Sequence, residues 1–149
     1  MNPIPIIVCG KSPKVATGVI NRIRPVYEAI HIIQSVEAGV RDIPSLIEGR
    51  PPPYKDTANL GTQKYGKRAA AVVVGGGYDD ANFAQLRSAC EGKSKIPWLR
   101  HDISKDFDPR QPRREIGVEY GEQTGKKVVD CLQDLARRGK MKEDGVYWF

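Results

Sequence analysis

The sequence is poor in the residues that build metal sites and disulfide frameworks. Its 149 residues include 2 histidines and 3 cysteines, and no two cysteines have the C-x-x-C spacing typical of zinc and redox sites. Because small secreted domains usually carry paired cysteines, these three predict reduced thiols in a cytoplasmic protein. We therefore expect no metal site.

Long apolar runs are absent as well. No stretch approaches the roughly 20 apolar residues of a membrane helix, so we expect no membrane association. The N-terminus also lacks the basic segment that begins a signal peptide. The hydrophobic fraction of 40% and the charged fraction of 28% are typical of a globular chain. The length fits one domain over residues 1–149.

Positive charge is in excess and concentrated in two segments. The formal net charge is +6, and residues 50–68 and 93–114 are the most basic parts of the chain. Basic loops on a neutral body attract anions. Zinc-finger spacing, a basic heptad helix and an aromatic RNA-binding strand are all absent, so nucleic acid is not an expected partner.

Apolar runs alternate with helical patterns along the chain. Continuous apolar runs predict strands at 4–8, 27–33, 69–74 and 96–99, and helical spacing predicts helices that begin near 13, 36, 80 and 116. Such alternation indicates a parallel sheet covered on both faces. We predict a small, doubly wound, Rossmann-like α/β sandwich of about four strands in the order 2-1-3-4. The aromatic tail at 145–149 is expected to pack against this body.

Residues 50–68 interrupt this alternation. They contain three consecutive prolines and five basic residues, with almost no apolar periodicity. Such a long connection is either a functional flap or an insertion. It is long enough to reach the opposite edge of the sheet, and whether it closes over a site there is left open.

The predicted topology places a ligand site between the first and third strands. In open parallel sheets, ligands bind outside the carboxyl ends of the strands, where the winding direction reverses. Two glycine turns lead there into helix N-termini, which attract anions. We expect an anionic small molecule to bind Gly10, Lys11, Ser12, Gly75, Gly76, Gly77 and Arg100, with Arg110, Arg113 and Arg114 further along.

The candidate catalytic residues lie at the same predicted edge. His101 and Asp102 end the fourth strand, and Tyr78 and Asp79 follow the second glycine turn. A histidine beside a carboxylate can transfer protons, although adjacent strand residues point to opposite faces. A small enzyme that uses His101, Asp79, Tyr78 and Lys11 is therefore the alternative to a binding protein.

Familiar phosphate and cofactor motifs are incomplete in this chain. Residues 10–12 resemble the end of a P-loop, but Pro5 stands where that motif needs a glycine. The dinucleotide fingerprint lacks its spaced glycines and its ribose-binding acid, so NAD(P) or another nucleotide is left open as a cofactor. Cys9 precedes a helix as in glutaredoxins and small phosphatases, but Val15 replaces the phosphatase arginine.

Two features favour a homodimer. Gly117, Gly121 and Gly125 share one face of the last predicted helix and would let another backbone approach, from the sheet or from a partner subunit. The aromatic residues at 147–149 are of the kind that is enriched at interfaces. A ligand-free interaction module is therefore a third interpretation.

The chain contains four short motifs: VCGKSP at 8–13, VVGGGYDD at 73–80, PWLR at 97–100 and VYWF at 146–149. Together they resemble a family of short fungal proteins with a Rossmann-like fold. The resemblance implies the fold and brings no established activity.

Overall fold

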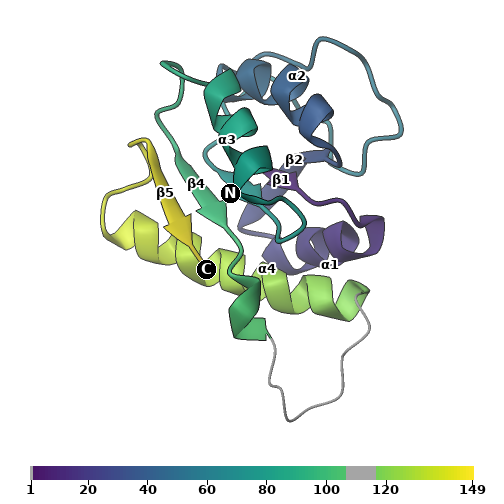
Figure 1. The fold of residues 1–149 in the computed structure, drawn as a ribbon, viewed down its shortest axis with the longest axis vertical. Helices are drawn as coiled ribbons and strands as arrows, with labels where there is room; N and C mark the ends of the chain where they lie inside the picture. Colours follow the sequence, from purple (N-terminus) through teal and green to yellow (C-terminus); the bar gives the residue numbers. More distant parts are fainter. Residues whose placement is uncertain (1, 107–116) are drawn as a thin grey trace.

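The computed structural model describes residues 2–106 and 117–149, and it is a Rossmann-like α/β fold built on one parallel sheet (Figure 1). The elements follow in the order β1 (Ile4–Cys9), α1 (Pro13–Ile23), β2 (Tyr27–Ile33), α2 (Val36–Ile47), β3 (Val72–Val74), α3 (Asp80–Ala89), β4 (Pro97–Arg100), the short 3-10 helix η1 (Ile103–Asp106), α4 (Val118–Arg137) and β5 (Gly145–Trp148). The sheet order is β2-β1-β3-β4-β5. The predicted order 2-1-3-4 is confirmed and is extended by a fifth strand.

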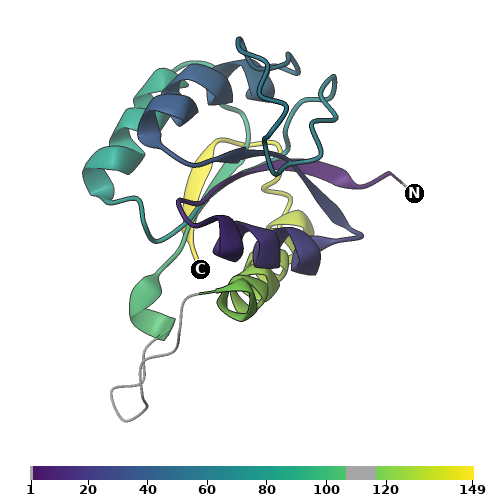
Figure 2. The ribbon, with the colours of Figure 1, turned by 90° about the vertical axis from the view of Figure 1, so that its right-hand side faces the viewer.

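Helices cover both faces of the sheet, with α1 and α4 on one side and α2 and α3 on the other (Figure 2). Successive side chains of β1 point to opposite faces of the sheet and contribute to both hydrophobic cores. Ile6 and Val8 pack toward α1 and α4, and Ile7 packs toward α2 and α3. Among the described residues, no helix is both long and apolar enough to cross a membrane.

Two strands differ from the prediction. The tail at 145–149, which was expected only to pack, forms the edge strand β5 and pairs in parallel with β4. Its side chains alternate: Trp148 is exposed, whereas Phe149 after it is buried. The third strand covers Val72–Val74. Before it, Ala69 donates its backbone N–H to the Leu46 carbonyl of α2, and only Ala70 and Ala71 make hydrogen bonds with β1.

Residues 50–68, which we call the edge strap, run along the outer edge of β2 and do not line the pocket described below. Thr62 and Gln63 donate backbone hydrogen bonds to the carbonyls of Ala29 and Ile30. Asn59 uses its side-chain amide to pair with both backbone groups of Ile32. The strap therefore supplies hydrogen-bond partners to the backbone at the outer edge of β2, which would otherwise be free to pair with a strand of another chain.

A buried polar network fastens the edge strap to the sheet. In β2, His31 Nδ1 lies 2.7 Å from the Tyr65 hydroxyl of the strap, and Nε2 lies 3.1 Å from Asp42 Oδ2 in α2. Arg41 also donates to the Asp42 carboxylate. Burial lowers the pKa of His31, and the hydrogen bond to Asp42 only partly opposes that effect.

The glycine face of α4 is used inside the chain. A Cβ at Gly121 would lie 2.1 Å from the Val15 carbonyl oxygen of α1, and one at Gly18 would lie 2.1 Å from the Val118 carbonyl oxygen. The two helices therefore touch backbone to backbone. Gly121 and Gly125 face α1 and are not available to a partner subunit, which corrects the expectation of a dimer through this face. The exposed Trp148 leaves self-association through β5 as a prediction.

Gly121→Ala is expected to lower the free energy of unfolding by about 3 kcal/mol, because the new methyl group meets rigid backbone and the helices must separate. Chemical denaturation of the purified chain measures the change. Gly117→Ala is the control, since no described atom lies within 4 Å of a Cβ there. An equal effect of the two substitutions would contradict the proposed contact.

His31 is expected to make the fold less stable in mild acid. Its folded pKa is depressed, so the unfolded chain binds the proton more readily than the folded chain. The free energy of unfolding should therefore fall as the pH drops below about 6.5, and level off below the folded pKa. Denaturation curves of the wild type and of His31→Gln, compared from about pH 8 to about pH 5, measure this contribution. If the free energy of unfolding changed with pH in the same way in both proteins, His31 would not be the cause of the loss of stability in acid.

Candidate functional site

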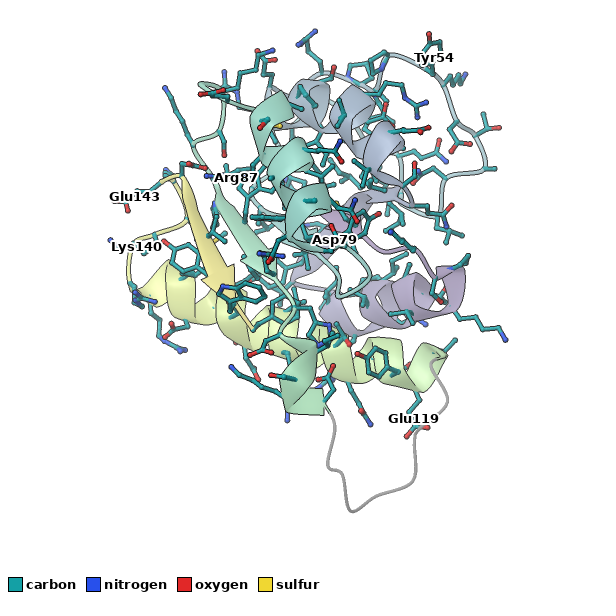
Figure 3. The ribbon with its side chains drawn as sticks, viewed as in Figure 1. Tyr54, Asp79, Arg87, Glu119, Lys140 and Glu143 are labelled. Atoms are coloured by element: carbon teal, nitrogen blue, oxygen red, sulfur yellow. The ribbon has the colours of Figure 1, made fainter. Side chains whose placement is uncertain are left out.

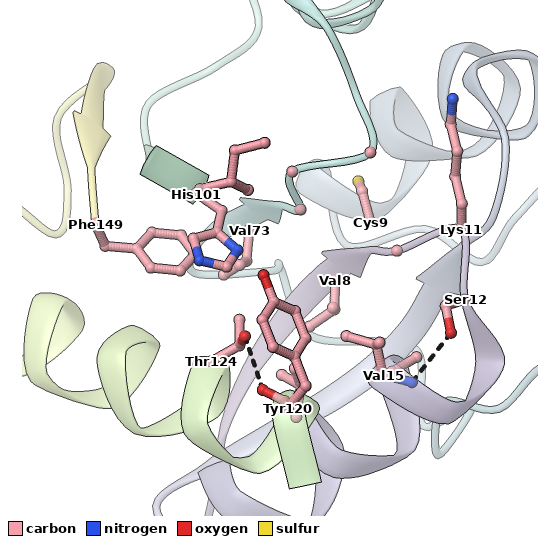
Figure 4. Close-up of a pocket in the computed structure, with 17 residues that line it drawn as sticks. Val8, Cys9, Lys11, Ser12, Val15, Val73, His101, Tyr120, Thr124 and Phe149 are labelled. Carbon is pink, nitrogen blue, oxygen red and sulfur yellow. Dashed lines mark hydrogen bonds between the residues drawn. The ribbon is translucent and has the colours of Figure 1, made fainter. Parts of the chain in front are cut away.

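A pocket of about 310 Å³ opens at the carboxyl edge of the sheet, between the turns that follow β1 and β3 (Figure 4). Its walls are mostly apolar and come from β1, β3, α1 and the segments after β4. They are formed by Val8, Val15, Ala16, Val19, Val73, Ile103 and Phe149. This is the position that the topology predicted for a ligand, at the reversal of winding between β1 and β3.

The two glycine turns form the rim of the pocket, and Gly10, Lys11, Ser12, Gly75, Gly76 and Gly77 all line it. A hydrogen bond of 2.8 Å from Gly75 N to the Cys9 carbonyl holds the turns together. Ser12 caps α1 by accepting from Val15 N. In the described part of the chain, the backbone N–H groups of Lys11, Ser12, Gly76 and Gly77 donate to no protein acceptor. They are therefore available to an anionic or oxygen-rich ligand.

Lys11 lines the pocket without turning its charge into it. Its ammonium lies 5.0 Å from the centre of the Tyr78 ring, a cation–π contact. Figure 4 shows the side chain pointing away from His101 and Tyr120. The aliphatic stem packs against the second glycine turn, where a Cβ at Gly77 would lie 3.5 Å from Lys11 Cδ.

His101 closes the far end of the pocket. Its side chain is 3% exposed, and Nε2 lies 2.8 Å from Asp106 Oδ2. The contact is bent, since the N–H direction misses the carboxylate and Nε2 forms no hydrogen bond of good geometry within the described residues. The ring stacks on Phe149 with centroids 5.0 Å apart and planes 9° from parallel.

Asp106 is held by two further groups from α4. The Tyr120 hydroxyl donates to Oδ2 at 2.6 Å, and the Lys127 ammonium donates to Oδ1. Burial alone would raise the pKa of Asp106, but the hydrogen bonds from Lys127 and Tyr120, together with the neighbouring His101, outweigh it and the pKa lies below its ordinary value. Burial and the Asp106 charge raise the pKa of Tyr120, so Tyr120 keeps its proton and donates it.

Arg100 does not join this site. Strand alternation turns it to the opposite face from His101, where its guanidinium lies between the rings of Phe83 and Trp148, at 4.3 and 4.2 Å from their centres. It also pairs with Asp80 Oδ1 at 2.8 Å. The expectation that Arg100 binds the pocket's ligand is therefore corrected. Arg110, Arg113 and Arg114 lie outside the described residues.

Tyr78 and Asp79 are also placed away from the pocket. The Tyr78 hydroxyl donates to the Ile33 carbonyl at 2.9 Å within the core beneath α2 and α3. Asp79, at the start of α3 (Figure 3), caps that helix and exchanges hydrogen bonds with Asn82. These contacts fit structural roles. Of the four candidate catalytic residues, His101 and Lys11 line the pocket, and Lys11 turns its ammonium toward Tyr78.

Cys9 borders the pocket, but its thiol lies in the core on the other side of the sheet. Burial raises its pKa far above the ordinary value for cysteine, with a smaller contribution from Cys90. The thiol therefore stays protonated at physiological pH and is a poor nucleophile.

Several residues of the site were not identified from the sequence. Tyr120 and Thr124 line the pocket from α4, and Asp106 and Phe149 hold His101. The spacing of Tyr120 and Thr124 by four residues places them on one helical face, which was a usable signal. The pairing of His101 with Asp106, in place of its neighbour Asp102, depends on the turn of η1 and had no comparable signal.

Comparison with known proteins finds similarity over nearly the whole chain to one fungal protein. Kojic acid related protein 6 of Aspergillus oryzae is 29% identical over 147 residues, which cover 97% of this chain and 86% of that protein. The resemblance to fungal proteins is confirmed to this extent.

A second similarity covers a shorter stretch. Anthranilate phosphoribosyltransferases from two Helicobacter pylori strains, HPAG1 and G27, are each 37% identical over 87 residues. The stretch covers 56% of this chain and 24% of each enzyme, so the match spans about a quarter of their length. No family model and no solved structure matches the chain.

Within residues 2–106 and 117–149, no group of three histidine, cysteine, aspartate or glutamate side chains is placed to hold a metal ion. The residues that line the pocket are suited to organic ligands: apolar walls, glycine turns with available N–H groups, and an imidazole at the far end.

Proposed function

We propose that this chain binds a small ring compound with an anionic or oxygen-rich group in the pocket between the turns after β1 and β3. The observation that carries the proposal is the pocket itself, an apolar cavity of about 310 Å³ at the position where open α/β sheets bind ligands. This volume is near the lower end of the range of about 300–1,000 Å³ for small-molecule sites.

The apolar walls favour a flat, largely carbon body for the ligand. Val8, Val15 and Val73 contribute branched aliphatic side chains, and Phe149 contributes an aromatic ring. Burying apolar ligand surface there is worth roughly 25 cal/mol per Å². A bare inorganic phosphate would leave these walls exposed to water, which makes it a weaker ligand than an anion with an attached ring.

The glycine turns favour a negative or oxygen-rich group at the rim. Four backbone N–H groups in these turns, those of Lys11, Ser12, Gly76 and Gly77, have no acceptor among the described residues. The N-terminus of α1 adds a partial positive charge. A phosphate, carboxylate or carbonyl of the ligand supplies the missing acceptors, and a nucleotide belongs to this class.

The names of the similar proteins suggest two further compounds to test. Kojic acid and anthranilate, from which those proteins are named, are both small oxygen-bearing rings. Both compounds therefore belong in a binding panel for this chain, beside nucleotides.

Thermal denaturation of the full chain with such a panel tests the proposal. The panel contains NAD, NADP, FMN, AMP, anthranilate, kojic acid and inorganic phosphate. A ligand at 100 times its dissociation constant stabilises the fold by about 2.7 kcal/mol, which corresponds to several degrees in this chain. We expect at least one ring compound to give such a shift and inorganic phosphate to give a smaller one.

Val15→Trp is expected to lower the affinity for that ligand at least tenfold, about 1.4 kcal/mol, because the indole fills the pocket. The control is Asn21→Trp, which adds the same side chain at an exposed position of α1 that does not line the pocket. Calorimetric titration of both variants measures the difference. Unchanged affinity in Val15→Trp would place the binding elsewhere.

A further inference from the structure

The imidazole of His101 is fixed in the wall of the pocket by contacts on several sides. Stacking on Phe149 sets the plane of the ring, and β4 sets the position of its backbone. The side chain is 3% exposed. Because the ring is held in one orientation, each of its two nitrogens faces a fixed set of neighbouring groups.

Nε2 faces a carboxylate that can only accept hydrogen bonds. Asp106 Oδ2 lies 2.8 Å from Nε2, and the carboxylate is kept ionised by the donors Tyr120 and Lys127. An unprotonated Nε2 would place a partial negative charge 2.8 Å from an ionised carboxylate oxygen, whereas an N–H group there places a partial positive charge beside it. The neutral imidazole therefore carries its proton on Nε2, even though the contact is bent.

Nδ1 is left as a hydrogen-bond acceptor on the side of the glycine turn. A Cβ added at Gly76 would lie 4.0 Å from Nδ1, and Gly76 lines the same pocket. Within the described residues, no donor is bonded to Nδ1, which is not fully buried and is open to the pocket. A ligand that displaces water from Nδ1 without supplying a donor loses that hydrogen bond, so a ligand that carries a donor is favoured over one that does not.

We infer that His101 selects ring compounds that carry a hydroxyl or N–H group, by accepting a hydrogen bond from that group at Nδ1. This inference rests on the proposed function and names the class of its ligand. For an acidic hydroxyl, the proton passes from the ligand oxygen to Nδ1 and the oxygen keeps the electron pair. The resulting imidazolium is stabilised by Asp106 beside Nε2, which is the arrangement of a general base with an orienting carboxylate.

The protonation of the ring is measurable without a ligand. Nitrogen-15 correlation spectra at about pH 8 distinguish the two neutral forms of imidazole, and the resonances of His101 are those that disappear in His101→Phe. We expect the proton on Nε2. A proton on Nδ1 would overturn the inference, because the nitrogen beside Gly76 would then be a donor.

Asp106→Asn tests whether that carboxylate sets the protonated nitrogen. The variant is expected to increase the fraction of rings protonated on Nδ1. The matched control is Asp102→Asn, since Asp102 adjoins His101 in sequence but bonds to Ser104 instead. The same ring form in both variants would overturn the role given to Asp106.

Ligand selection is tested with 4-hydroxybenzoate and 4-fluorobenzoate, which are close in size but differ in the ability to donate a hydrogen bond. We expect the hydroxyl compound to bind at least tenfold more tightly to the wild-type chain. In His101→Phe, which keeps a flat ring against Phe149, the two affinities should become equal.

The outcomes separate the inference from the proposed function. Equal binding of the two benzoates to the wild type, or a preference that survives in His101→Phe, overturns the role of His101 while the pocket remains a binding site. If neither benzoate binds, and none of the ring compounds in the thermal panel does, the proposed function fails. The spectra of the unliganded protein then still decide which nitrogen carries the proton.

Discussion

The backbones of α1 and α4 touch where Gly18 meets Gly121, and the pocket depends on that contact. The same turns of the two helices carry pocket walls: Val15 and Val19 in α1, Tyr120 and Thr124 in α4. Larger residues at the two glycines would separate the helices and change the width of the cavity. The contact therefore links a packing requirement in the core with the geometry at the carboxyl edge.

Strand alternation divides the polar residues of that edge between two different environments. His101 turns toward α4 and meets Asp106, whereas Arg100 turns toward α3 and lies between two aromatic rings. Residues adjacent in sequence are thus separated by the thickness of the sheet. The result is an apolar pocket lined by the His101 imidazole, with Asp106 in contact with that ring but not among the lining residues. Lys11 directs its charge toward Tyr78.

The fold was largely predictable because its signals are local. Continuous apolar strands, a Ser-Pro helix start and glycine turns all act over a few residues, and the strand order followed from general rules of connection. β5 was missed because its four residues alternate between half-buried and exposed positions on an edge, and a pattern that short resembles a packed tail. The edge strap was recognised as an insertion, but its place along β2 depends on individual hydrogen bonds of Asn59, Thr62 and Gln63.

The position of the candidate site was predictable from the sequence, but only some of the residues that form it were. The glycine turns line the pocket because the topology brings them there. Tyr78 and Asp79 were misassigned since a core hydrogen bond and a helix cap also use polar residues after a glycine turn. Asp106 and Phe149 come to His101 through η1 and β5, which are contacts between distant segments that no local pattern encodes.

A titration of the full chain followed by backbone amide resonances tests the central claim most directly. The titrant is the ring compound that gives the largest thermal shift. The account predicts that the largest resonance changes fall on Lys11, Ser12, Gly76 and Gly77, the rim amides that have no acceptor within residues 2–106 and 117–149. Changes centred instead on Gln34, Ser35 and Asn59, which line a separate cavity beside His31, would contradict it.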